Sequence, residues 1–158
     1  MSIESHQENL RAEHMLGAPG VAVSGVIWII AGLTAYSASF QWSVLVFFFG
    51  GMLIYPLSSF LAKTLQPAIE PQKDNPLNTL ALEGTAFLFV GLFVGYILIL
   101  NALPDLFYPV MLLAIGARYL TFQTLYGARL YWGLGLILCA LGLLNIQMFH
   151  LPPYAAAL

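Results

Sequence analysis

The most constraining feature of this sequence is a stretch of 48 consecutive residues, Met15 to Ala62, without an Asp, Glu, Lys or Arg. A helix rises about 1.5 Å per residue and a hydrocarbon core is about 30 Å thick, so one crossing takes roughly 20 apolar residues. The stretch therefore fits two membrane crossings joined by a tight turn. A soluble fold is excluded, because only 8% of the 158 residues are charged, against about 25% in soluble domains.

The same reasoning predicts an all-α fold, a polytopic membrane bundle of about five transmembrane helices. The expected spans are about 19–36, 42–61, 80–100, 106–125 and 130–149. The polar residues 37–41 supply the first turn, and Pro104 ends the third span because proline cannot continue the hydrogen-bond ladder. Gly127 separates the last two spans. Residues 17–150 thus form the bundle, and residues 151–158 form a C-terminal tail.

Residues 1–16 predict a short N-terminal cytoplasmic helix. Ser5 and Glu8 have capping-box spacing, so we expect the helix to begin near Ser5. Its polar face carries three Glu against one Arg, whereas a helix that lies on a membrane normally presents Lys and Arg. We therefore expect it to dock on the inner side of the protein rather than on lipid.

Basic residues set the expected orientation. An excess of Lys and Arg in short loops marks the cytoplasmic side of a membrane protein. With the N-terminus inside, four basic residues fall in the cytoplasm and none outside: Arg11, Lys63, Lys73 and Arg129. The sequence predicts a cytoplasmic N-terminus, an outer C-terminus and a location in the cell inner membrane.

Composition also excludes several classes of function. With a net charge of −2, the chain lacks the basic surface that a nucleic-acid-binding protein needs. The expected partner is the lipid bilayer. Cys139 is the single cysteine, and no spacing of His, Cys, Asp and Glu indicates a metal site or a cofactor. Phosphate loops and nucleophile elbows are missing as well, which speaks against the ordinary enzyme classes.

Glu83 and Arg118 are the two charges that the predicted spans place inside the membrane. Such groups are expensive there and usually face a bundle interior or a wet cavity. Their predicted depths nearly match on sequential helices, so we expect them to meet. The pair would then be either a binding or gating site for an ion or polar solute, or a structural ion pair.

Polar residues follow Arg118 along the fourth span. Tyr119, Thr121 and Gln123 are further candidates for a binding or gating site, and Thr121 shares a helical face with Arg118 by its spacing of three. These side chains either line a cytoplasm-facing cavity or hydrogen-bond to neighbouring helices.

A weak internal repeat relates the first two spans to the next two at an offset of 66. Gly25 then matches Gly91, and Gly50 matches Gly116. The matches either record a parallel duplication or arise by chance among glycines in apolar sequence.

Four short motifs resemble those of a family of small bacterial integral membrane proteins catalogued as a domain of unknown function. The motifs are Leu16-Gly17-Ala18-Pro19, Asp74-Asn75-Pro76-Leu77, Gly116-Ala117-Arg118-Tyr119-Leu120 and Leu125-Tyr126-Gly127. Arg118 stands where members of that family carry His, so the resemblance implies a polar group at this position. It implies a membrane protein and brings no substrate, cofactor or activity.

Three functions are consistent with these features. The first is translocation of a small solute or ion through a polar site near Arg118 and Glu83, and with only five helices this is expected to need a homo-oligomer. The second is a structural or regulatory membrane subunit without transport or catalytic activity of its own. The third is a lipid-modifying enzyme, for which the sequence supplies no nucleophile or metal set.

Overall fold

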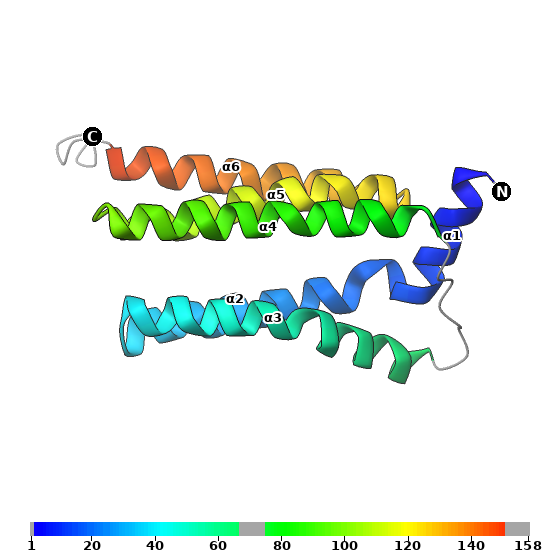
Figure 1. Cartoon of the computed structure of the whole chain (residues 1–158), viewed down its shortest axis with the longest axis horizontal. Helices are drawn as coiled ribbons and strands as arrows, with labels where there is room; N and C mark the ends of the chain where they lie inside the picture. The colour runs from blue at the N-terminus through cyan, green and yellow to red at the C-terminus, as the bar shows by residue number, and fades with distance from the viewer. Residues whose placement is uncertain (1, 67–74, 151–158) are drawn as a thin grey trace. The chain divides into compact units, whose positions relative to one another are not determined.

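The computed structural model describes residues 2–66 and 75–150, and all regular elements in these ranges are helical. The elements are α1 (Ile3–His14), the 3-10 turn η1 (Met15–Gly17), α2 (Ala18–Ser37), α3 (Phe40–Leu65), α4 (Leu77–Leu100), the 3-10 turn η2 (Pro104–Leu106), α5 (Phe107–Tyr126) and α6 (Leu130–His150) (Figure 1). Within the described residues, five helices are long and apolar enough to cross a membrane. The predicted all-α membrane fold is confirmed.

The observed helix ends lie close to the predicted ones, and the largest differences have local causes. α3 continues past Lys63 to Leu65, because a cation in the last turn interacts favourably with the helix dipole. Pro104 does not start α5 directly; it opens η2, a single 3-10 turn that precedes Phe107. The predicted C-terminal tail, 151–158, lies outside the described residues.

The N-terminal helix begins earlier than expected. Ser2, not Ser5, stands at the N-cap position: Ser2 Oγ accepts a hydrogen bond from Ser5 N at 3.4 Å, and α1 starts at Ile3. Ser5 therefore lies inside the first turn of α1, and Ser2 stands three residues before the position that the spacing of Ser5 and Glu8 indicates.

A left-handed turn separates α1 from α2. Met15, Leu16 and Gly17 have φ angles of 50°, 60° and 77°. Left-handed backbone costs a residue with a side chain about 1–2 kcal/mol, so two of these three positions are strained. The chain thus breaks the helix sharply at the point where the apolar stretch begins.

The chain divides into two compact units. One consists of Met1–Gln7 and Asp74–Leu158 and holds the start of α1 with α4, α5 and α6; we call it the three-helix unit. The other, Glu8–Lys73, holds the rest of α1 with α2 and α3; we call it the helix-pair unit.

Glycines set the contact between α4 and α5 in the three-helix unit. Gly84, Gly91 and Gly95 are buried along one face of α4. Gly91 lies against the side chain of Ala114, and a methyl group at Gly95 would lie 2.7 Å from the ring of Phe107. Small residues thus let the two backbones approach closely, as is common between membrane helices.

The contact between α5 and α6 brings backbone against backbone. A methyl group at Gly116 would lie 2.6 Å from Cys139 Sγ and 2.8 Å from Gly135 O. In return, a methyl group at Gly135 would lie 2.8 Å from Gly116 O. α5 is therefore in tight contact with a neighbour on two sides, which makes it the central helix of the unit.

The helix-pair unit is held together near its turn. Ser43 is fully buried, and its Oγ donates a hydrogen bond to Ala31 O at 2.6 Å. One turn further on, the rings of Trp28 and Phe47 meet edge to face with their centroids 4.9 Å apart.

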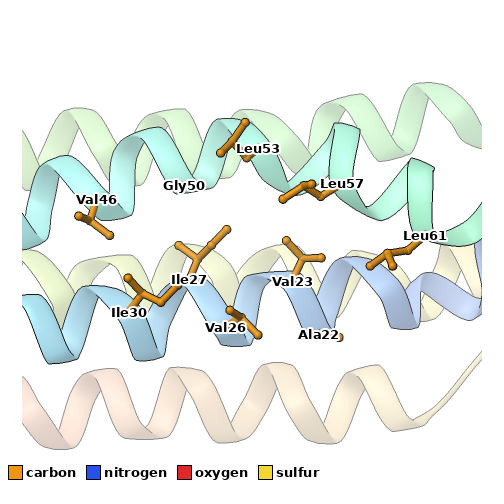
Figure 2. Close-up of a pocket in the computed structure, with 10 residues that line it drawn as sticks. All are labelled: Ala22, Val23, Val26, Ile27, Ile30, Val46, Gly50, Leu53, Leu57 and Leu61. Carbon is orange, nitrogen blue, oxygen red and sulfur yellow. The ribbon is translucent and has the colours of Figure 1, made fainter.

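Toward its other end, the helix-pair unit opens into an apolar groove of about 390 Å³ between α2 and α3. Figure 2 shows the side chains on both walls of this groove. They are Ala22, Val23, Val26, Ile27, Ile30, Val46, Gly50, Leu53, Leu57 and Leu61.

The contacts do not follow the offset of 66 suggested by the sequence. Gly91 packs against α5, whereas no atom of another described helix lies within 4 Å of a methyl group placed at Gly25. Gly50 faces Ile27 of the preceding helix, whereas Gly116 faces the following helix, α6. The two helix pairs therefore use their matched glycines differently, which favours chance over duplication.

Candidate functional site

Arg118 lies in the middle of α5, and its side chain is partly buried in the three-helix unit. Its Cζ lies 5.4 Å from the centre of the Phe122 ring, one turn further toward the end of α5. Its Nε is buried and has no hydrogen-bond partner among the residues that the structure describes. The cation therefore interacts with an aromatic face, and at least one of its donors is unsatisfied.

Gly84 of α4 makes room for this side chain. A methyl group at Gly84 would lie 3.7 Å from Arg118 Cγ and 2.9 Å from Thr121 Oγ1. The Thr121 hydroxyl donates a hydrogen bond to Arg118 O at 2.7 Å. Arg118 and Thr121 thus face the same part of α4, which confirms that they share one helical face.

Tyr119 points into an aromatic cluster rather than toward Arg118's face. Its ring contacts Phe122, with the centroids 5.4 Å apart, and Tyr131 of α6, at 5.9 Å. Tyr126 joins the same cluster through Phe122 and Tyr131. Tyr119, Tyr126 and Tyr131 are each at most 8% exposed, so they form the core at this end of the unit.

Glu83 does not pair with Arg118. Its side chain is exposed on α4, and no carboxylate among the described residues forms an ion pair with Arg118. The expectation that the two charges meet was therefore wrong. Matched depth placed them on neighbouring helices, but Gly84 is the residue that faces α5, and Glu83, one position earlier, is turned about 100° away.

Gln123 helps to end α5 through its backbone carbonyl. Its carbonyl accepts the hydrogen bond of Gly127 N at 2.7 Å, and Gly127 ends α5 in the left-handed conformation with φ of 61°. Of the candidates from the sequence, the structure thus brings Arg118 and Thr121 together, and it places Tyr119, Gln123 and Glu83 elsewhere.

Sequence reasoning missed two residues of this site. Phe122 follows Arg118 by four positions, the spacing at which side chains meet on a helix, and this signal was available. Gly84 precedes Gly91 by seven positions and so lies on nearly the same face of α4. That spacing predicts a shared packing face, but it does not say which side chain fills the space opposite.

The start of α1 docks at this end of the three-helix unit. Gln7 Nε2 donates a hydrogen bond to Thr124 O at 2.7 Å, and Asn75 Nδ2 donates one to His6 O at 2.9 Å. Residues 2–7 thus contact the end of α5 and the chain just before α4.

Comparison with known proteins gives a family and no function. The sequence matches the profile described as "Family of unknown function (DUF7010)" over residues 3–157. The chain belongs to the DUF7010 family. No curated protein and no solved structure matches it.

For this DUF7010 chain, the site has the chemistry of an anion-binding group. A guanidinium offers five donors, and here the Nε donor lacks a protein partner. In the part of the chain that the structure describes, no three His, Cys, Asp or Glu side chains gather as a metal site would require. Arg118 is therefore the candidate ligand-binding residue of this site.

Proposed function

We propose that this membrane protein binds a small anionic solute at Arg118 and moves it across the bilayer. An arginine in the middle of a membrane helix costs about 2.5–3.5 kcal/mol even on insertion scales, and it is usually paired with another group. Phe122 satisfies Arg118 only in part, since a ring offers no lone pair to the N–H groups. An anion from solution would supply the missing acceptor.

The observation that carries this proposal is the buried, unpartnered Nε of Arg118. An ion pair with Glu83 would have given Arg118 a structural role, but the two side chains do not form one. The hydroxyl of Thr121 bonds to the backbone of Arg118 and fixes the local helix surface. These contacts favour a binding role for the free guanidinium donors.

The orientation that we propose puts this site on the cytoplasmic side of a bacterial inner membrane. It rests on Arg11, Lys63, Lys73 and Arg129, which all fall on one side of the five spans. A reporter fused after Leu158 should then be active in the periplasm of a bacterial host. Cytoplasmic activity would contradict the proposed orientation.

Liposome flux tests the translocation proposal directly. The full-length protein would be reconstituted, and the influx of chloride, sulfate, phosphate and acetate would be measured for wild type, Arg118→Lys and Arg118→Met. We expect flux of at least one of these anions, and a reduction of about tenfold or more in Arg118→Met, because a hydrogen bond to a charged group contributes about 1.5–3 kcal/mol. Equal flux in wild type and Arg118→Met would contradict the role of Arg118.

A second candidate function is a structural or regulatory membrane subunit. One observation favours it: between Arg118 and the start of α5, the glycine contacts of α4 with α5 are apolar, with Gly91 against Ala114 and Gly95 against Phe107. These contacts offer an anion no polar group, so translocation would need a path built with other helices, as in a homo-oligomer. Absence of flux for every anion, with full thermal stability of the reconstituted protein, would favour this second function.

A further inference from the structure

The beginning of α1 is tied to the three-helix unit by hydrogen bonds between residues far apart in the sequence. Gln7 and Thr124 are separated by 117 positions, and His6 and Asn75 by 69. In both bonds one partner lies in α1: Gln7 donates with its side chain, and His6 accepts with its backbone carbonyl. These hydrogen bonds fix the position of the start of α1 on the three-helix unit.

Asn75 connects this contact to the start of α4. Its Oδ1 accepts a hydrogen bond from Leu77 N at 3.0 Å, while its Nδ2 donates to His6 O. Only 3% of Asn75 is exposed. One buried side chain thus satisfies a free N–H group at the start of α4 and holds the start of α1 in place.

The contact lies at the end of α5 toward which Arg118 extends. Thr124 follows Arg118 by six residues, which is about 9 Å along the helix axis. The guanidinium lies over Phe122, between these two positions along α5. Thr124 also lies one turn beyond Thr121, so the residues bound at Thr124 lie beside the end of the face that carries Arg118 and Thr121.

We infer that residues 3–7 form a lid over this end of the three-helix unit and regulate access to the face of α5 that carries Arg118 and Thr121. This inference rests on the proposed function only in taking the entering molecule to be a small anionic solute. Below, these residues are called the lid.

The lid is built to open. The bond between Gln7 and Thr124 is exposed, so water can replace it. At its other end, α1 runs into the left-handed residues Met15, Leu16 and Gly17, where the helix is broken. Two hydrogen bonds therefore hold the lid, and the break in the helix at residues 15–17 lets it move away once they are lost. Loss of the exposed bond between Gln7 and Thr124 should shift the closed–open equilibrium about fivefold toward the open state.

Thiol labelling tests the lid in the full-length protein. In a Cys139→Ala background, Thr121→Cys would be labelled with a membrane-impermeant maleimide in inside-out vesicles, with and without Gln7→Ala. We expect Gln7→Ala to raise the labelling rate about fivefold. The matched control is Glu8→Ala, which changes the adjacent, exposed residue of the same helix and should leave the rate unchanged.

Two further variants keep the test decisive. Deletion of residues 2–7 removes the lid and should bring the labelling rate at position 121 close to that of Thr124→Cys, an exposed position on the same helix. Met111→Cys reports on global unfolding, since Met111 is buried in the core of the unit. A rate at position 121 that does not respond to Gln7→Ala or to the deletion would overturn the lid, as would an equal rise at position 111.

The same preparations separate this inference from the proposed function. Stabilisation by added chloride, sulfate, phosphate or acetate would be measured as a shift in melting temperature, with Arg118→Met as the reference. If Gln7→Ala speeds labelling at position 121 but no anion raises the melting temperature through Arg118, the lid is supported and anion binding is refuted. Stabilisation dependent on Arg118 with unchanged labelling would refute the lid and leave the proposed function in place.

Discussion

In the three-helix unit, Gly91 and Gly116 bring neighbouring helices close together, whereas in the helix-pair unit no atom of another described helix lies within 4 Å of a methyl group added at Gly25 or Gly32. The difference does not come from glycine content. It comes from the residues opposite: Ala114 and Gly135 are small, so the space beside Gly91 and Gly116 is filled by the approach of a backbone.

In the helix-pair unit, a side chain rather than a backbone fills the space beside a glycine. Gly50 faces Ile27, whose branched side chain fills the space and holds α2 and α3 apart. Near the turn, the buried bond of Ser43 to Ala31 O fixes the pair. Further along, α2 and α3 leave the apolar groove of about 390 Å³ between them. The comparison shows that a glycine alone does not bring two helices together, because the side chain opposite decides whether a backbone or a side chain fills the space beside it.

The largest expected effect tests this comparison at the centre of the three-helix unit. Gly116→Ala should destabilise the protein by about 1–3 kcal/mol, because its methyl group would meet Cys139 Sγ and the backbone of Gly135. The matched change in the helix-pair unit, Gly32→Ala, should be neutral or stabilise by up to about 1 kcal/mol, since alanine favours helix. Thermal unfolding in detergent measures both. Equal losses would show that the two units do not differ in packing.

The second prediction concerns the polar contact of the helix-pair unit. Ser43→Ala should cost about 1 kcal/mol, since it removes a buried hydrogen bond between two membrane helices and leaves Ala31 O without it. Ser37→Ala is the control, because the Ser37 hydroxyl is exposed and bonds to Leu33 O of its own helix. The same unfolding assay applies. A loss at Ser37 as large as that at Ser43 would contradict the role of Ser43 in fixing the pair.

The third prediction compares the ends of two helices in the three-helix unit. After α4, Ala102 adopts φ of 60°, and the bonds Leu103 N to Leu98 O (2.9 Å) and Ala102 N to Ile99 O (3.1 Å) form a Schellman motif. After α5, Gly127 takes the same left-handed conformation. Ala102 is exposed, so Ala102→Gly should stabilise by about 1 kcal/mol. Gly127→Ala should destabilise by a similar amount. A stabilising Gly127→Ala would refute the left-handed end of α5.

The smallest expected effect is in the groove. Ala22→Leu should change the stability by no more than about 0.5 kcal/mol, because the space beside Ala22 admits the larger side chain. Ala114→Leu is the matched change in the three-helix unit, and it should cost about 1–3 kcal/mol because Gly91 leaves no room. Similar effects of the two leucines on the melting temperature would mean that the groove is filled.

The sequence alone determined the class of fold and, within a few residues, where the five membrane helices begin and end. The stretch from Met15 to Ala62 without a charge, together with Pro104 and Gly127, suffices to predict α2 to α6 within a few residues. This follows because helix length in a membrane is set by hydrocarbon thickness and because every backbone group must be satisfied within the helix. Neither requirement depends on which helices are neighbours.

Only the tertiary structure decided which side chains meet. The sequence places Glu83 and Arg118 at similar depths, but a rotation of about 100° between adjacent residues puts Gly84, and not Glu83, against α5. It also leaves open that Gln7 reaches Thr124 across 117 positions. In an apolar chain every face of a helix is compatible with lipid, so periodicity does not reveal the packed face. The choice depends on the fit of small and large side chains between helices, which exists only once the bundle has formed.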